Sequence, residues 1–140
     1  MQHKKINYKD CEIYYKIIGK GKPILFIHGF AEDGYVWQYQ IDFLKDHYQI
    51  IVPDIPGSGQ SSIVDWINNI DSLAESIKAI LDEEQIANCT VIGHSLGGYI
   101  TLALAEKHPQ LLNGFGLFHS SAFADTEEKK TSKIKIDRFY

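Results

Sequence analysis

The feature that most constrains this chain is the pentapeptide Gly93-His94-Ser95-Leu96-Gly97, which lies between two segments of different periodicity. The apolar run at 89–92 predicts a buried strand, and the run at 99–105 predicts a helix. Glycines on either side of the serine are typical of a sharp strand-to-helix turn, because residues without a Cβ let the two elements approach closely. Such a turn strains Ser95 and raises its hydroxyl clear of its neighbours, as a serine nucleophile requires.

The rest of the chain alternates short apolar strands with amphipathic helices. It therefore predicts an α/β fold with a mostly parallel sheet, an N-terminal antiparallel hairpin and helices on both faces. The expected strands are 3–8, 12–18, 24–27, 50–52, 89–93 and 112–118, and the expected helices are 35–46, 70–84 and 96–107. In such sheets the ligand crevice lies beyond the carboxyl ends of the strands. Phe30, Asp54, Ser95 and His119 all fall at such ends.

Composition and charge exclude several classes of protein. The 140 residues carry a net charge of −4 without a basic stripe, so no nucleic-acid partner is expected. No apolar run approaches the ~20 residues that cross a bilayer, and the first eight residues lack a signal-peptide core. The predicted location is therefore the cytoplasm, away from membranes. Cys11 and Cys89 are expected to be small buried residues. No metal-ligand spacing or nucleotide-binding pattern is present, so neither a metal nor a cofactor is expected.

Three motifs occur in the order found in the α/β-hydrolase fold, which the chain resembles from residue 3 to about residue 120. The motifs are His28-Gly29-Phe30, Asp54-x-x-Gly57-x-Gly59-x-Ser61 and Gly93-His94-Ser95-Leu96-Gly97-Gly98. The resemblance implies that Ser95 is the nucleophile and that the backbone N–H groups of Phe30 and Leu96 form an oxyanion hole. Dehalogenase-like and epoxide-hydrolase-like branches of the family place Asp at the serine position. The resemblance therefore favours acyl transfer to water from a small ester, lactone, thioester or amide.

Other residues of these motifs are expected to have structural roles. His94 is expected beneath the turn that carries the serine, and His28 is expected to brace the oxyanion loop rather than transfer protons. Asp54 precedes the serine, whereas the family order is Ser, then Asp or Glu, then His. Gly57 and Gly59 mark its loop as a tight turn, so a structural role for Asp54 is favoured over that of a triad acid.

The acid and the base of the family's triad both come well after the serine. We therefore expect the chain to stop after about six strands, with residues 1–124 as the N-terminal part of the core and 125–140 as the start of a cap. Within the chain, His119 is the alternative base, because its strand is expected beside that of Ser95, and Asp125 is its conceivable orienting acid. A triad needs directed hydrogen bonds, however, and proximity alone does not supply them.

The strand at 112–118 is expected to form an open sheet edge with an apolar face. Such edges pair with other chains, so self-association or a completing partner is expected. The sequence predicts a serine hydrolase of small acyl substrates by family, and leaves open whether these 140 residues are active. The alternative is a non-catalytic α/β-hydrolase-like fragment that binds a ligand in the crevice or a protein at the edge.

Overall fold

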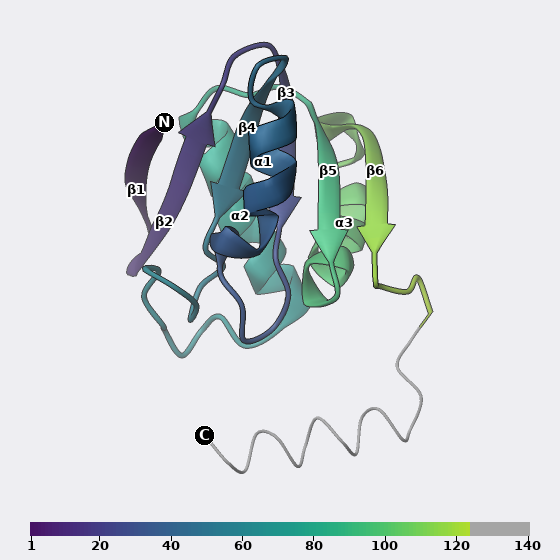
Figure 1. Cartoon of the computed structure of the whole chain (residues 1–140). Coiled ribbons are helices and arrows are strands. Elements are labelled where there is room, and N and C mark those ends of the chain that lie inside the picture. Colours follow the sequence, from purple (N-terminus) through teal and green to yellow (C-terminus); the bar gives the residue numbers. More distant parts are fainter. Residues whose placement is uncertain (124–140) are drawn as a thin grey trace.

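A six-stranded mixed sheet runs through the molecule in the order β1-β2-β4-β3-β5-β6 (Figure 1). The computed structural model describes residues 1–123. The strands are β1 (Gln2–Tyr8), β2 (Cys11–Ile18), β3 (Lys22–Ile27), β4 (Tyr48–Pro53), β5 (Cys89–His94) and β6 (Leu112–Phe118). β1 and β2 form an antiparallel hairpin, β2 pairs antiparallel with β4, and the other pairs are parallel. The predicted fold class is confirmed.

Helices cover both faces of this sheet. They are η1 (Gly34–Trp37), α1 (Gln38–Leu44), α2 (Ile70–Glu83), α3 (Leu96–Lys107) and η2 (Pro109–Leu111). Figure 1 shows α1 on one side of the sheet and α2 and α3 on the other. Two separate clusters of buried side chains lie between these layers, one beneath α2 and α3 and one beneath α1.

The central strands contribute to both clusters. Leu25 of β3 belongs to the cluster beneath α2 and α3, whereas its neighbour Phe26 belongs to the cluster beneath α1. In β4, Ile51 and Val52 divide in the same way. Successive strand residues point to opposite faces, so a strand covered on both sides must be apolar throughout. Burial of each such side chain stabilises the fold by about 1.5–3 kcal/mol.

The helix expected at 35–46 is divided in two. Asp33 begins a 3-10 turn by accepting a hydrogen bond from Tyr35 N at its Oδ1, and α1 follows only after Trp37, whose φ of −92° and ψ of 8° are not α-helical. The first turn is held from below, because Gly34 N donates to the buried carboxylate of Asp54 at 2.9 Å. The helical periodicity of the sequence gives no sign of that tertiary hydrogen bond.

The proposed cap at 125–140 lies outside the described residues.

Candidate active site

Ser95 occupies the junction between β5 and α3 in a strained backbone conformation. Its φ is 50° and its ψ is −112°, and its side chain is exposed. A positive φ in a residue with a Cβ costs about 1–3 kcal/mol and persists only where the surroundings enforce it. Here Ser95 N donates to Phe118 O at 3.0 Å, and Ser120 Oγ donates to Ser95 O at 2.8 Å. The neighbouring strand β6 and the residues after it therefore hold the serine in place.

Two glycines allow α3 to sit directly against the sheet at this turn. A Cβ built on Gly93 would lie 2.2 Å from Gly97 O, and a Cβ built on Gly97 would lie 2.2 Å from Ile27 O. Both distances are well below any tolerated contact with backbone, so only glycine fits at either position. These glycines were expected because residues without a Cβ let strand and helix approach closely, and the built Cβ distances agree with that reason.

His28 fixes the loop that follows β3. Its side chain is fully buried, and Ile55 N donates to its Nε2 at 3.0 Å. Because Nε2 accepts, the proton of the neutral ring is on Nδ1, which donates to Gly29 O at 2.7 Å. Burial lowers the pKa of His28 below its usual value, which keeps the ring neutral. His28 is thus committed to two structural hydrogen bonds.

The hydrogen bond from His28 also orients the next peptide. The C=O and N–H groups of one trans peptide point in opposite directions, so holding the Gly29 carbonyl turns the N–H of Phe30 away from His28. The loop approaches the serine closely, since a Cβ built on Gly29 would lie 3.2 Å from Ser95 Cβ. The Phe30 side chain itself is 58% exposed.

Glu32 joins this loop to the turn of Ser95, and the sequence analysis did not identify it. Its Oε2 accepts from Gly29 N at 2.7 Å and lies 2.8 Å from His94 Nδ1. The His94 ring lies against Trp37, Phe118 and His119, with centroid distances of 5.7–6.3 Å. No sequence signal distinguishes Glu32 from the adjacent Asp33, because both are acids in the same short loop.

Asp54 is buried beneath its own loop and is bound by backbone N–H groups. Its Oδ1 accepts from Gly34 N and its Oδ2 accepts from Gln60 N, each at 2.9 Å. Gly57 and Gly59 both have positive φ, and a Cβ on Gly59 would lie 2.1 Å from Asp54 Oδ2. This arrangement is that of a tight turn closed around a carboxylate. Both carboxylate oxygens of Asp54 are thus occupied by backbone donors of the surrounding loops.

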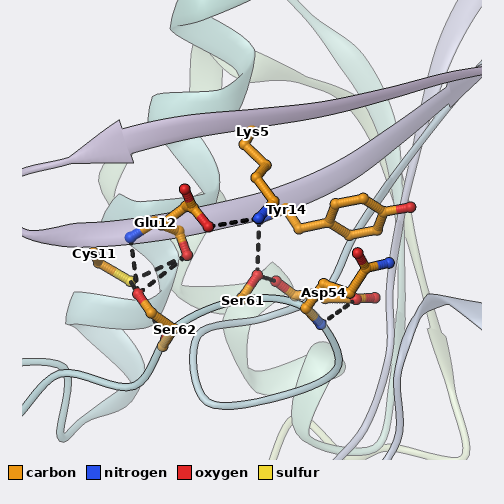
Figure 2. A network of polar contacts seen from close by, with 8 residues as sticks. Lys5, Cys11, Glu12, Tyr14, Asp54, Ser61 and Ser62 are labelled. Carbon is orange, nitrogen blue, oxygen red and sulfur yellow. Dashed lines mark hydrogen bonds and ion pairs between the residues drawn. The ribbon is translucent and has the colours of Figure 1, made fainter.

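The end of the Asp54 loop is attached to β2 through two serine hydroxyls (Figure 2). Tyr14 N donates to Ser61 Oγ at 2.9 Å, and Ser61 Oγ donates to Asp54 O at 2.6 Å. Glu12 N donates to Ser62 Oγ at 2.8 Å. The serines thus satisfy backbone donors of β2 where its pairing with β4 has ended, and they hold the loop against the sheet.

The loops at this end of the sheet border a shallow hollow of about 560 Å³ that is open to solvent. It is lined by Ala31, Glu32, Asp33, Tyr35, Val36, Gly57, Ser58 and Gly59, and Ser95 does not line it. His119 lies at the same end of the sheet with an exposed side chain and a φ of 46°, and its ring packs against those of Phe118 and His94. Asp125, its expected orienting acid, lies outside the described residues.

Within residues 1–123, no group of three or more His, Cys, Asp and Glu side chains is arranged to hold a metal ion. None of the helices in this part of the chain is both long enough and apolar enough to cross a bilayer.

The fold and the site together define a class of protein. It is an α/β sandwich with a strained serine at the carboxyl end of its parallel strands, beside a His-Gly loop. The chain belongs to the α/β-hydrolase fold family, whose model matches residues 22–131.

The proteins that this chain is similar to have names that refer to different activities. The chain is 31% identical over 147 residues to epoxide hydrolase 4 of Mus musculus, covering 99% of this chain and 41% of the relative. It is 35% identical over 107 residues to the dihydrolipoyllysine-residue acetyltransferase component of the acetoin cleaving system of Cupriavidus necator, covering 76% and 29%. A thermophilic esterase from Thermogutta terrifontis superimposes with a TM-score of 0.88 at 28% identity, covering 97% and 52%. The chain thus spans between 29% and 52% of these relatives' own lengths.

Proposed function

We propose that this chain carries the nucleophile and the oxyanion hole of a serine hydrolase that acts on small carboxylic esters, lactones, thioesters or amides. The observation that carries the proposal is the exposed Ser95 at a φ of 50° at the start of α3. A strained serine at this point of the fold has its hydroxyl presented to the crevice, where an acyl group can be attacked. The proposed location of the protein is the cytoplasm.

In the proposed reaction, Ser95 Oγ attacks the carbonyl carbon of the substrate and gives its proton to a base. The negative oxygen that forms takes hydrogen bonds from the N–H groups of Phe30 and Leu96, each worth about 3–4 kcal/mol. Leu96 is the first residue of α3, so its N–H has no acceptor within the helix. Collapse of this intermediate breaks the acyl bond, and the base returns its proton to the leaving group, which becomes an alcohol, thiol or amine. Water then attacks the acyl-enzyme, which gives the carboxylic acid and restores the serine.

The relatives support hydrolysis as the reaction class and leave the substrate open. One is named as an esterase and another as an epoxide hydrolase. The serine at position 95 favours acyl transfer, because the resemblance places an aspartate there in epoxide-opening branches. The base is proposed to be a histidine outside these 140 residues, since residues 124–140 contain none, with His119 as the alternative inside the described chain.

A fluorophosphonate probe tests the proposal directly, because it reacts covalently with an activated serine. We expect the natural gene product to be labelled on Ser95, as located by peptide mass spectrometry, and the Ser95→Ala variant to remain unlabelled. The same gene product is expected to hydrolyse short-chain nitrophenyl esters, and Ser95→Ala is not.

The second candidate is a non-catalytic domain that binds a ligand in the crevice. It is favoured by the open hollow of about 560 Å³ beside the Gly57–Gly59 turn. It predicts equal ligand-dependent stabilisation of the wild type and Ser95→Ala, without labelling or turnover in either. That pattern would replace the hydrolase proposal. The intact mass of the natural gene product, compared with 15.9 kDa, shows whether further chain is present to supply the base.

A further inference from the structure

Glu32 connects the two segments that carry the proposed oxyanion donors. We propose that it is a positioning residue, which fixes the distance between the loop of Phe30 and the turn of Ser95. The inference rests on the proposed function, since the two segments matter together only if both serve one reacting oxygen. It concerns a side chain that lies outside the three motifs.

A single carboxylate oxygen makes both connections. Glu32 Oε2 accepts from Gly29 N at 2.7 Å, and the same atom is 2.8 Å from His94 Nδ1. A carboxylate has no proton to give, so the proton in the second bond belongs to His94 Nδ1. Gly29 immediately precedes Phe30, so the first bond is one residue from the Phe30 N–H group. His94 is two residues before Leu96, so the second bond is two residues from the Leu96 N–H group.

The contact between Glu32 and His94 lies where the sheet no longer links the Phe30 loop to the turn of Ser95. The last residue pair in the register of β3 with β5 is Ile27 with Gly93. Beyond it, β3 continues into the His28 loop and β5 turns into α3, so the ladder of backbone hydrogen bonds has ended. Glu32 reaches across this gap from the far side of the loop. Glu32 thus adds a direct hydrogen-bonded link between the two segments beyond the end of the ladder.

Spacing is the quantity that an oxyanion hole needs. Two N–H groups stabilise one oxygen only if both lie within about 2.7–3.1 Å of it. The Glu32 and His94 side chains are 29% and 21% exposed, so their bond is partly shielded from water. Charge-assisted hydrogen bonds in such surroundings are stronger than those at an open surface.

The chain offers a matched control. Glu75 and His108 form a second pair of the same kind, with Oε1 and Nε2 2.8 Å apart and side-chain exposures of 36% and 19%. That pair joins α2 to the end of α3, far along the helix from Ser95. Substitutions of Glu75 therefore report what the loss of such a pair does to stability without touching the proposed site.

The experiment compares Glu32→Leu and Glu32→Gln with Glu75→Leu and Glu75→Gln. The amide oxygen of the Gln variant can still accept from Gly29 N, whereas Leu can accept nothing. We expect the fluorophosphonate labelling rate of Ser95 to fall about tenfold or more in Glu32→Leu and to change less than about threefold in Glu32→Gln. Neither Glu75 variant is expected to change it.

A second measurement does not depend on activity. In ¹⁵N-resolved spectra, we expect Glu32→Leu to shift the amide signals of Phe30 and Leu96 together, and Glu32→Gln to restore most of both shifts. His94→Phe removes the same bond from the other side and is expected to shift the same two signals. It replaces Glu32→Leu if that variant does not fold.

The outcomes separate the two proposals. If wild-type Ser95 is never labelled but the signals of Phe30 and Leu96 move together, the proposed function fails, and Glu32 still fixes the spacing of the two segments but serves no reacting oxygen. Shifts confined to residues 29–32, with those of 94–96 unmoved, overturn the positioning role. Labelling of folded Glu32→Leu at the wild-type rate overturns it as well.

Discussion

Replacing Gly97 with alanine adds one methyl group at the closest approach of α3 to the sheet. The new Cβ would lie 2.2 Å from Ile27 O and 2.7 Å from His28 O. An ordinary carbon–oxygen contact is about 3.3 Å or longer, so α3 must move away by about 1 Å. Both oxygens belong to backbone: Ile27 is the last residue of β3 and pairs with Gly93 of β5, and His28 follows it. The strand cannot yield in the way that a side chain can.

The expected loss of unfolding free energy is at the upper end of the range for overpacking, about 3 kcal/mol. Helix propensity acts in the opposite direction, because alanine is favoured over glycine in a helix by about 1 kcal/mol. The sign of the measured change in unfolding free energy therefore shows whether overpacking or helix propensity dominates. This change is measured by urea unfolding monitored with far-UV circular dichroism, with the midpoint and the slope fitted separately.

Gly114→Ala is the matched control for this substitution. A Cβ built on Gly114 meets nothing within 4 Å. Alanine in a strand loses less backbone entropy on folding than glycine, so this variant is expected to be neutral or slightly stabilised. If Gly97→Ala unfolds at the same urea concentration as Gly114→Ala, then α3 can retreat freely, and the close approach is not what shapes the turn of Ser95.

Three further outcomes follow from the same structure. Burial lowers the pKa of His28 below 6.5 in the folded chain. As the pH falls, the His28 ring of the unfolded chain is therefore protonated before that of the folded chain. The unfolding free energy is then expected to fall as the pH drops below about 6.5, and a His28→Asn variant with the same slope would contradict this. Asp54→Asn turns an amide group towards one of two backbone donors and is expected to destabilise the fold by about 1–3 kcal/mol. The folded variant should still be labelled on Ser95, and loss of labelling would make Asp54 a triad acid after all. The 140-residue chain is expected to self-associate through β6, whose Phe115 and Phe118 are each 49% exposed. A clean monomer by light scattering at high concentration would contradict that.

Much of the fold was predictable because it depends on local pattern. The strand at 112–118 and the helix at 96–107 have the bounds of β6 and α3, since an apolar run marks the strand and the glycines at 97–98 and Pro109 lie at the two ends of the helix. The helix expected at 35–46 was the main error in the elements. Its periodicity is real, but the first turn is a 3-10 helix, and its first residue, Gly34, donates to Asp54, twenty residues away.

The candidate site was predictable only in part, for a similar reason. Ser95, His28 and Asp54 belong to motifs whose spacing carries the signal. Glu32 belongs to none, and its partner His94 lies 62 residues further along the chain. A contact of that range leaves no periodicity in the sequence. The hydroxyl of Ser120, which donates to Ser95 O, escaped notice in the same way.

The sequence alone determined the order of strands and helices and the place of the serine between β5 and α3. Hydrophobic periodicity and the absence of side chains at Gly93 and Gly97 are properties of neighbouring residues, so they are visible in the chain itself. Only the tertiary structure decided which side chains hold the Ser95 turn and the Phe30 loop together. Those hydrogen bonds form between segments far apart in sequence, and folding alone brings their donors and acceptors within reach.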